Sequence, residues 1–418
     1  MPINSARRTF LRCVGAGLTV AAVSTTVTAQ ESGWTEVPSP KDGALHDVVH
    51  TATGLYAVGD GGVVIKRTSE GWKTVFEDGP SSNGRNLLGA EVTDDGDRLW
   101  FVGKSGAVGV FDVQTDSLVA DPSSPNDYTD NFNDVAVTGT AGQADVYVAS
   151  NAGQIHYSFE NGEDETWNET TVGEGNGIKA IDFHGDESGH AVTGNQTVFE
   201  TSDGATYQKI GIADSDVDFF GIDSEAPDDV WVTGGSGTVY RWDGSTWTSE
   251  QIGAPDRPRL SDIEVESGSG ITVGNSGAAF DLASGSWNQQ ETPTGQNLAA
   301  VARGSPDAAV GASGTILERS DSDGGSGGDG SGDGSGDDSS GDGSGDNSSG
   351  GGSGDDGSGD DSDPLPPEFE RFDTDDSGEI SRGDVINAIR AHNEDEQIGG
   401  ESVEKSDVVS LISFYNSN

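Results

Sequence analysis

Thiols are nearly absent from this chain, which has 418 residues and a single cysteine, Cys13. Cys13 lies in an N-terminal stretch that we expect to be removed on export, so the mature protein would contain no thiol. Disulfide bonds, cysteine nucleophiles and cysteine-based metal sites are therefore excluded from the mature chain.

Basic residues are also scarce, with 21 Lys and Arg against 73 Asp and Glu and a net charge of −52. A surface of this sign repels phosphate backbones and anionic lipids, so we expect no nucleic-acid partner. At 1 M salt the Debye length falls to about 3 Å, which screens the repulsion among carboxylates and leaves them to keep the chain soluble. In this respect the composition resembles that of proteins from salt-loving archaea.

An apolar run, Val14–Val23, is too short and too rich in Ala, Gly and Thr to span a bilayer. It follows Arg7 and Arg8 in "SARRTFLR", which matches the twin-arginine export consensus, and precedes a small-residue cleavage site that ends at Ala29. We therefore predict a signal peptide over 1–29, secretion or display at the cell surface, and no membrane insertion.

A repeat of about 40 residues fills the chain from 31 to 320. Each copy opens with an apolar segment, and the seven segments are 45–50, 87–92, 132–137, 178–183, 219–223, 260–265 and 298–302. A second segment ends on a small residue, where we expect glycine to supply the positive φ of a tight hairpin. These residues are Gly59, Gly103, Ala149, Gly194, Gly234, Gly274 and Gly311. A third segment follows, and a fourth opens on an aromatic in five copies: Trp72, Trp167, Tyr207, Trp247 and Trp287.

Four short strands in each of seven copies predict an all-β fold, a seven-bladed β-propeller over 30–320. The last copy stops after its third strand, "TILER" (315–319), and an unpaired strand, "GWTEV" (33–37), stands at the other end. We predict that this N-terminal strand completes the last blade and closes the ring, which removes exposed sheet edges.

Two turns, "TSDGATY" (201–207) and "WDGSTW" (242–247), resemble degenerate Asp-boxes of the BNR and photosystem II assembly factor-like propellers. The resemblance covers most of 33–319. It implies that Asp203 and Asp243 hold turns through side-chain to backbone hydrogen bonds. Sialidases with this fold need an arginine triad, and the arginines here form no recognisable trio, so we expect no catalytic residues and no enzymatic activity.

Acidic residues occupy the third or fifth position of the first strands: Asp47, Glu91, Asp134, Asp182, Asp223, Asp262 and Glu264. First strands line the channel of a propeller, and alternate residues share a face. Two interpretations stay open, an acidic channel that binds a cation or cationic ligand and a plain water-filled channel. His46 and His50 also share a face, as a metal pair or, in the preferred reading, as ordinary channel or packing residues.

Residues 321–366 form a linker rich in Gly, Ser and Asp that cannot build a core, so we expect disorder there. Beyond it, "DTDDSGEISRGD" has oxygen ligands at calcium-loop spacing around Gly378. The predicted Ca²⁺ ligands are Asp373, Asp375, Ser377, Glu379 (through its carbonyl), Ser381 and Asp384. Asp384 reaches less far than the usual Glu, which predicts modest affinity.

The segment 379–393 recurs as 402–416, each with apolar positions at helical spacing. Two tandem loop–helix units resemble a type I dockerin over 367–418, which implies a small α-helical EF-hand domain and a cohesin-like partner. The second loop departs from the family pattern, because Glu396, Ile398 and Gly400 replace the expected ligands.

We therefore expect a monomeric, exported, non-enzymatic binding protein. Its propeller would bind an extracellular glycan or protein, and its dockerin-like module would attach it in the presence of Ca²⁺. The alternatives are an extracellular carbohydrate-active hydrolase carried on a dockerin, and a structural cell-surface protein.

Overall fold

The computed structural model describes residues 33–172, 175–212 and 215–319, together with 372, 397–398 and 401–402. The chain divides into two compact units, Met1–Asp329 and Gly330–Asn418. In the second unit, β29 (Gln397–Ile398) pairs with β30 (Glu401–Ser402) in an antiparallel hairpin. The predicted signal peptide, linker, calcium loop and helices lie outside the described residues.

The first unit consists of seven four-stranded antiparallel sheets, the blades of a seven-bladed β-propeller. Blade 1 contains β2 (Leu45–Thr51), β3 (Gly54–Gly59), β4 (Val63–Thr68) and β5 (Gly71–Phe76). Blade 2 contains β6 (Leu87–Val92), β7 (Arg98–Gly103), β8 (Val108–Asp112) and β9 (Ser117–Ala120). Blade 3 contains β10 (Phe132–Thr138), β11 (Asp145–Ser150), β12 (Gln154–Ser158) and β13 (Asn168–Thr171).

The other four blades follow the same order. Blade 4 contains β14 (Ile178–Gly185), β15 (Ser188–Thr193), β16 (Thr197–Thr201) and β17 (Gln208–Gly211). Blade 5 contains β18 (Phe219–Ala226), β19 (Asp229–Gly234), β20 (Thr238–Trp242) and β21 (Trp247–Gln251). Blade 6 contains β22 (Leu260–Glu266), β23 (Ser269–Gly274), β24 (Ala279–Ala283) and β25 (Ser286–Gln290). Blade 7 contains β26 (Leu298–Ala302), β27 (Asp307–Gly311), β28 (Ile316–Arg319) and β1 (Thr35–Glu36).

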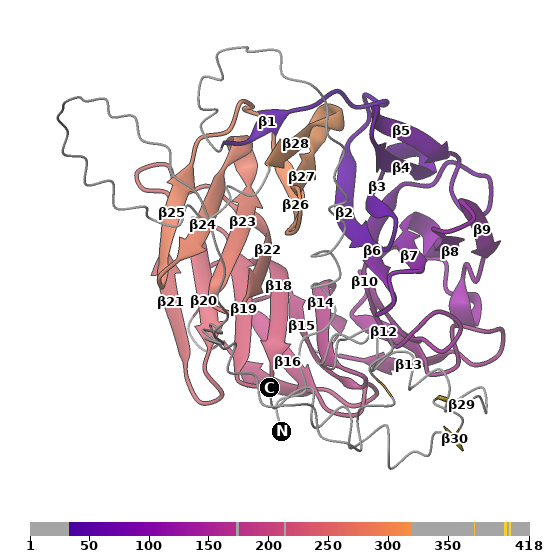
Figure 1. Cartoon of the computed structure of the whole chain (residues 1–418). Helices are drawn as coiled ribbons and strands as arrows, with labels where there is room; N and C mark the ends of the chain where they lie inside the picture. Colours follow the sequence, from indigo (N-terminus) through magenta and orange to yellow (C-terminus); the bar gives the residue numbers. More distant parts are fainter. Residues whose placement is uncertain are drawn as a thin grey trace, which may run out of the picture. The chain divides into compact units, whose positions relative to one another are not determined.

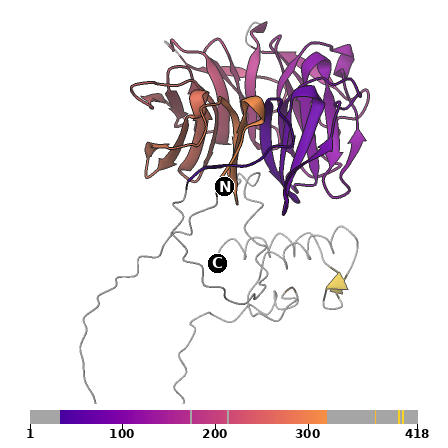
Figure 2. The ribbon, with the colours of Figure 1, turned by 90° about the horizontal axis from the view of Figure 1, so that it is seen from above.

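The blades form a ring around a central channel (Figure 1), with the first strand of each blade innermost. Successive first strands contact each other, and β26 returns to contact β2. Seen edge-on, the ring is a flat disc (Figure 2). No described segment forms a helix long and apolar enough to cross a membrane.

The core lies between blades because each sheet is buried on both faces. The hydrophobic clusters each join two adjacent blades, as where Tyr56 and Val64 of blade 1 pack with Phe101 and Phe111 of blade 2. Second strands are the most buried, and in β7 every residue after Arg98 is buried. Near-continuous apolar second strands are therefore the sequence signature of this packing.

The closure of the ring by the N-terminal strand is confirmed. Thr35 pairs with Glu318, Glu36 pairs with Leu317, and the Val37 N–H donates to the Ile316 carbonyl at 3.0 Å. Trp34 is buried and packs in a cluster with Leu317 and side chains of blade 6.

Two side chains of β28 connect the seam, the pairing of β1 with β28, to the neighbouring blades. The Arg319 guanidinium lies 4.7 Å from the centre of the Trp34 ring and donates to Asp281 of blade 6 at 2.7 Å. The Glu318 carboxylate accepts hydrogen bonds from the Trp72 indole at 2.7 Å and from Arg67, both in blade 1, at 2.9 Å. The last blade is therefore joined to both of its neighbours by buried or half-buried polar groups.

The expected reason for glycine at the ends of the second strands is wrong. Gly103 and Gly311 have φ of −173° and −174°, an extended conformation open to any residue. Glycine is needed there because a Cβ would overlap the carbonyl oxygen just before the partner strand, that of Asn86 or Asn297. The positive φ falls in the turn that follows, as at Ser313 and Gly314.

The predicted end of the second strand is one residue off in two blades. The partner of the opening residue is Gly59 in blade 1 but Ser150 in blade 3 and Thr193 in blade 4. The small residues predicted at Ala149 and Gly194 are therefore neighbours of the equivalent positions.

We predict that Trp34→Ala lowers the free energy of unfolding by about 3–5 kcal/mol, the usual cost of truncating a buried Trp. The indole contributes to the core between blades 6 and 7 and carries the stacked Arg319. Chemical denaturation measures the free energy of unfolding. The matched control is Glu36→Ala, which truncates an exposed side chain of β1. Equal stability of the two variants would contradict the role of β1 in closure.

Candidate functional site

The six predicted Ca²⁺ ligands, from Asp373 to Asp384, lie outside the described residues. The candidate sites among the described residues are the central channel and the grooves between outer strands.

The channel is lined by the acidic positions that alternation along the first strands predicts. Six of the seven predicted side chains border it: Asp47, Glu91, Asp134, Asp182, Asp262 and Glu264. Asp223 is not among the lining residues and is buried, with 1% of its surface exposed.

The channel carboxylates join neighbouring blades, which sequence reasoning missed. Asp134 accepts the N–H of its own neighbour, Val135, and that of Ile181 in blade 4, both at 2.9 Å. Asp47 likewise accepts the N–H of Val48 and that of Ala90 in blade 2, both at 2.8 Å.

The same arrangement recurs around the ring. Asp182 accepts the N–H of Ser224 in blade 5 at 2.7 Å, and Asp262 accepts that of Val301 in blade 7 at 2.9 Å. We call these four side chains, Asp47, Asp134, Asp182 and Asp262, the carboxylate clasps. Each first strand is the inner edge of its sheet, so N–H groups on its free side have no ladder partner, and the clasps accept them.

Burial and mutual repulsion raise the pKa of two clasps. Burial is the main cause of the raised pKa of Asp47, and the charges of Asp134 and Asp262 add to it. Burial raises the pKa of Asp134 to about 8, helped by the charges of Asp262 and Glu91 and opposed by the two N–H donors. At neutral pH the channel therefore holds fewer negative charges than its carboxylates suggest.

The channel is too small to be the binding site for a large ligand. Its cavity measures about 70 Å³, whereas sites for small molecules begin near about 300 Å³. Among the described residues no group of three or more His, Cys, Asp or Glu is placed to hold a metal ion. The geometry favours the plain channel over a ligand-binding one.

His46 and His50 have separate partners and form no metal pair in the described part of the chain. The His46 Nε2 lies 2.9 Å from Asp60 Oδ1, and the His50 Nε2 lies 3.1 Å from the Pro306 carbonyl oxygen. Burial lowers the pKa of His50 to about 4, so this imidazole is neutral and packs between blades 1 and 7.

A serine lies between two histidines at the ends of inner strands. The Ser224 hydroxyl is 2.7 Å from the Nδ1 of His190 and 2.9 Å from that of His184. Burial lowers the pKa of His190 to about 3, too low for a base that must remove a proton near neutral pH. Ser224 is also only 3% exposed, so the trio stabilises the fold and does not form a nucleophilic site.

The two predicted aspartate turns are confirmed. Asp203 Oδ1 accepts the N–H groups of Ala205 at 3.0 Å and Thr206 at 2.7 Å, and Asp243 Oδ1 accepts those of Ser245 and Thr246. Hydrogen bonds from the Thr206 hydroxyl and backbone lower the pKa of Asp203 to about 2.

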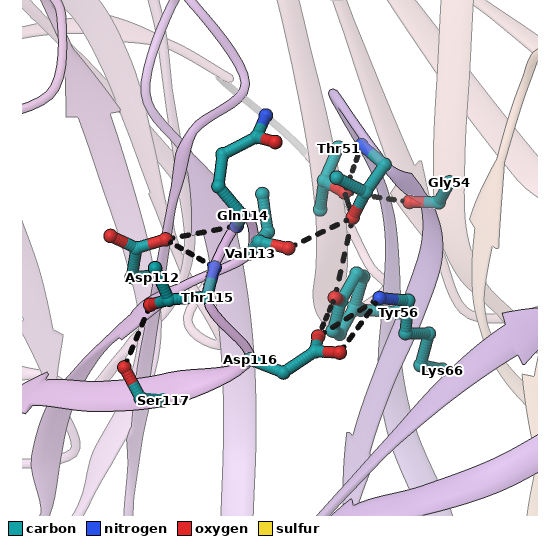
Figure 3. Close-up of polar contacts among 11 residues, drawn as sticks. Thr51, Gly54, Tyr56, Lys66, Asp112, Val113, Gln114, Thr115, Asp116 and Ser117 are labelled. Atoms are coloured by element: carbon teal, nitrogen blue, oxygen red, sulfur yellow. Dashed lines mark hydrogen bonds and ion pairs between the residues drawn. The ribbon is translucent and has the colours of Figure 1, made fainter.

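A third turn of this kind, in blade 2, was missed. Asp112 Oδ1 accepts the N–H groups of Gln114 and Thr115, both at 2.9 Å (Figure 3). The signal that could have found it is a Thr three residues after the Asp, as in "DGAT", "DGST" and "DVQT".

The blade 2 turn also binds blade 1 (Figure 3). Asp116 accepts hydrogen bonds from the Tyr56 hydroxyl and the Lys66 ammonium, both at 2.9 Å. The Thr53 hydroxyl donates to the Val113 carbonyl at 3.3 Å. These polar contacts join blade 2 to blade 1.

Two grooves flank the outer strand of blade 5. The groove towards blade 6 has a volume of about 430 Å³ and is bordered by Trp231, Arg241 and Trp287, among others. The groove towards blade 4 has a volume of about 290 Å³ and is bordered by Tyr240 and Trp247, among others. Both combine aromatic rings with hydroxyl groups, as binding sites for small ligands do.

Four propeller arginines are bonded to carboxylates of the fold and do not converge on one site. They form the pairs Arg67–Glu318, Arg98–Asp112, Arg241–Asp229 and Arg319–Asp281.

Comparisons with known proteins establish the fold. No family model matches the chain, and no curated protein matches its sequence. Virginiamycin B lyase from Staphylococcus aureus aligns at 13% identity and a TM-score of 0.57, over 69% of this chain and 98% of that one. YCF48 bound to D1 peptide aligns at 12% identity and 0.57, over 70% and 98%. The WD40 propeller of Doa1 aligns at 13% identity and 0.56, over 70% and 98%. At these identities the likeness concerns architecture alone.

We predict that the contribution of Asp134 to stability falls as pH rises from about 4 to about 8, because folded Asp134, with a pKa of about 8, keeps a proton that the unfolded chain releases near pH 4. The protonated carboxyl group contributes its full stabilisation below the pKa that Asp134 has in the unfolded chain. This stabilisation is lost as the pH rises past the pKa of Asp134 in the folded chain. Buried His50 and His190, with pKa values of about 4 and about 3, act in the opposite direction below about pH 6.5, so the variant is compared with the parent chain at each pH. Between pH 5.5 and 8.5, denaturant unfolding should show that the parent chain loses stability relative to Asp134→Asn, although the amide of this variant accepts only one N–H and lowers stability overall.

Asp203→Asn is the control for this pH dependence. With a folded pKa of about 2, Asp203 is ionised in both states throughout the range, so its replacement should leave the slope unchanged. A slope in Asp134→Asn that equals the slope of the parent chain would contradict the assignment.

Proposed function

We propose that this protein is an exported, non-enzymatic binding protein, secreted or displayed at the cell surface. Its propeller binds an extracellular glycan or protein, and its dockerin-like module attaches the chain in the presence of Ca²⁺. The observation that carries the binding role is the pair of grooves of about 430 and 290 Å³ on a closed, rigid ring. Rigid scaffolds that present concave, partly aromatic surfaces are typical of recognition sites.

Solved propellers of the same architecture support a binding role by analogy. YCF48 is seen bound to D1 peptide, and a propeller chain of similar fold belongs to a mitotic checkpoint complex. Virginiamycin B lyase is an enzyme on this architecture, so the fold alone does not decide between binding and catalysis.

The channel geometry favours binding over glycoside hydrolysis. A hydrolase needs a pair of carboxylates that face a bound sugar. The channel carboxylates border a cavity of only about 70 Å³, and the clasps bond the backbone of the next blade. A substrate screen with the mature chain would detect turnover, and hydrolysis of any extracellular polysaccharide would overturn the non-enzymatic assignment.

The attachment role rests on the sequence of the calcium loop. Asp373, Asp375, Ser377 and Asp384 would supply side-chain oxygens, Glu379 its carbonyl and Ser381 a water-mediated contact. The linker of Gly, Ser and Asp would let this module reach a partner without restraining the propeller. The partner would be cohesin-like.

We predict that Asp373→Ala weakens Ca²⁺ binding about tenfold or more, from a dissociation constant of about 10⁻⁴–10⁻³ M. Isothermal titration of the mature chain at fixed ionic strength measures it. Asp355→Ala, which removes an equal charge from the linker, should bind Ca²⁺ like the parent chain. Unaltered affinity in Asp373→Ala would refute the loop assignment.

The attachment role makes a separate prediction about the native cell surface. The immobilised mature chain should retain its partner from a cell-surface fraction in Ca²⁺ and release it when a chelator is added. Asp373→Ala should retain none, whereas Asp355→Ala should behave like the parent chain. Retention that is indifferent to both the chelator and Asp373→Ala would rule out calcium-dependent attachment.

A further inference from the structure

The groove between blades 5 and 6 is built from cross-strand rows that face each other. On blade 5, Trp231 pairs with Arg241, and Arg241 pairs with Thr248, so the three side chains form one row. Val239 and Glu250 form the next row on the same face. On blade 6, Leu282 pairs with Trp287 and forms the opposite wall.

Two glycines border the groove on the blade 6 side. Gly268 and Gly285, at the tips of the blade 6 hairpins, border the opening. Both have positive φ, of +78° and +75°, and a Cβ at either would meet no atom within 4 Å. The inter-blade core, which is tight near the channel, therefore gives way to a cleft of about 430 Å³ at the rim.

The aromatic side chains of the groove are held in place. The Trp231 and Trp287 rings meet edge to face, 6.0 Å apart and at 80°. The Arg241 guanidinium lies 4.9 Å from the Trp231 ring, and its Nε donates to Asp229 Oδ1 at 3.1 Å. Such preorganised rings lose little entropy when a ligand binds.

The polar groups of the groove supply donors and acceptors without a net positive charge that would attract an anion. The Arg241 side chain is 49% exposed, so its terminal amino groups can donate to a ligand. The exposed Thr248 hydroxyl and Glu250 carboxylate can accept. Arg241 is already paired with Asp229 and lies near Glu250, and the chain carries a charge of −52, so an anionic ligand is repelled.

A neutral ligand with an apolar face and many hydroxyl groups matches this chemistry. A sugar ring presents its C–H face to an indole and its hydroxyl groups to a guanidinium and a carboxylate. The half-buried Trp287 offers that indole, whereas Trp231 is buried beneath Arg241 and supports it. The volume lies within the range of about 300–1,000 Å³ for small-ligand sites. We propose that the groove between blades 5 and 6 binds a short stretch of a neutral glycan. This inference rests on the binding role proposed above and assigns it a site and a ligand class.

The test is isothermal titration of the mature chain with neutral tetrasaccharides of the cello, xylo, manno and chito series. Oligogalacturonate and a lysine-rich peptide are the charged comparisons. We expect at least one neutral series to bind, and both Trp287→Ala and Arg241→Ala to weaken it about tenfold or more, equivalent to about 1.4 kcal/mol. Asn288→Ala, the exposed neighbour of Trp287 on β25 whose side chain points to the other face, should bind like the parent chain.

Thermal unfolding of each variant separates loss of binding from loss of folding. Arg241→Ala removes a half-exposed side chain, so it remains informative if Trp287→Ala fails to fold. Absence of binding by all four neutral series, binding of the peptide alone, or unaltered affinity in Arg241→Ala would overturn the proposal. If no sugar binds but the calcium-dependent partner is still retained, the attachment role stands and this site assignment fails.

Discussion

The pairing of a two-residue strand with the last blade is the constraint on which the propeller depends. Only Thr35 and Glu36 form ladder pairs with β28, yet they convert seven sheets into a ring. So short a strand forms few hydrogen bonds of its own. Other contacts also hold the last blade in the ring: the buried Trp34 ring, the stacked Arg319 and the bonds of Glu318 to blade 1. Once the ring is closed, every blade has two neighbours, and the core between each pair is complete.

The sequence was sufficient to predict the blades because their signal is local and repeated. The seven first strands, the closing strand and the turns of Asp203 and Asp243 all follow from short patterns. The strand ends of blades 3 and 4 were predicted one residue off because Ser150 and Thr193 stand where blade 1 has a glycine, so the small-residue pattern pointed to the residue beside each of them instead. The extended Gly311 is explained only by a carbonyl from the neighbouring strand.

The sites were harder to predict than the fold because they depend on residues from different blades. Alternation placed Asp134 in the channel, but its bond to the Ile181 N–H depends on how blades 3 and 4 pack against each other. The groove likewise needs Trp231 and Trp287, which belong to separate repeats and meet only when blades 5 and 6 pack. Acidic residues in the channel thus serve largely as backbone acceptors, and the wider concave surface lies at the rim.

The seam in blade 7 also determines how the propeller would respond to mechanical force. Because β1 and β28 are antiparallel neighbours, Thr35 and Glu318 lie side by side where the chain enters and leaves the ring. A load applied between the two ends would therefore break the ladder one bond at a time, as in unzipping, rather than shear all the bonds together. The ladder between β1 and β28 is accordingly the part of the propeller that tension between its own two ends would open first.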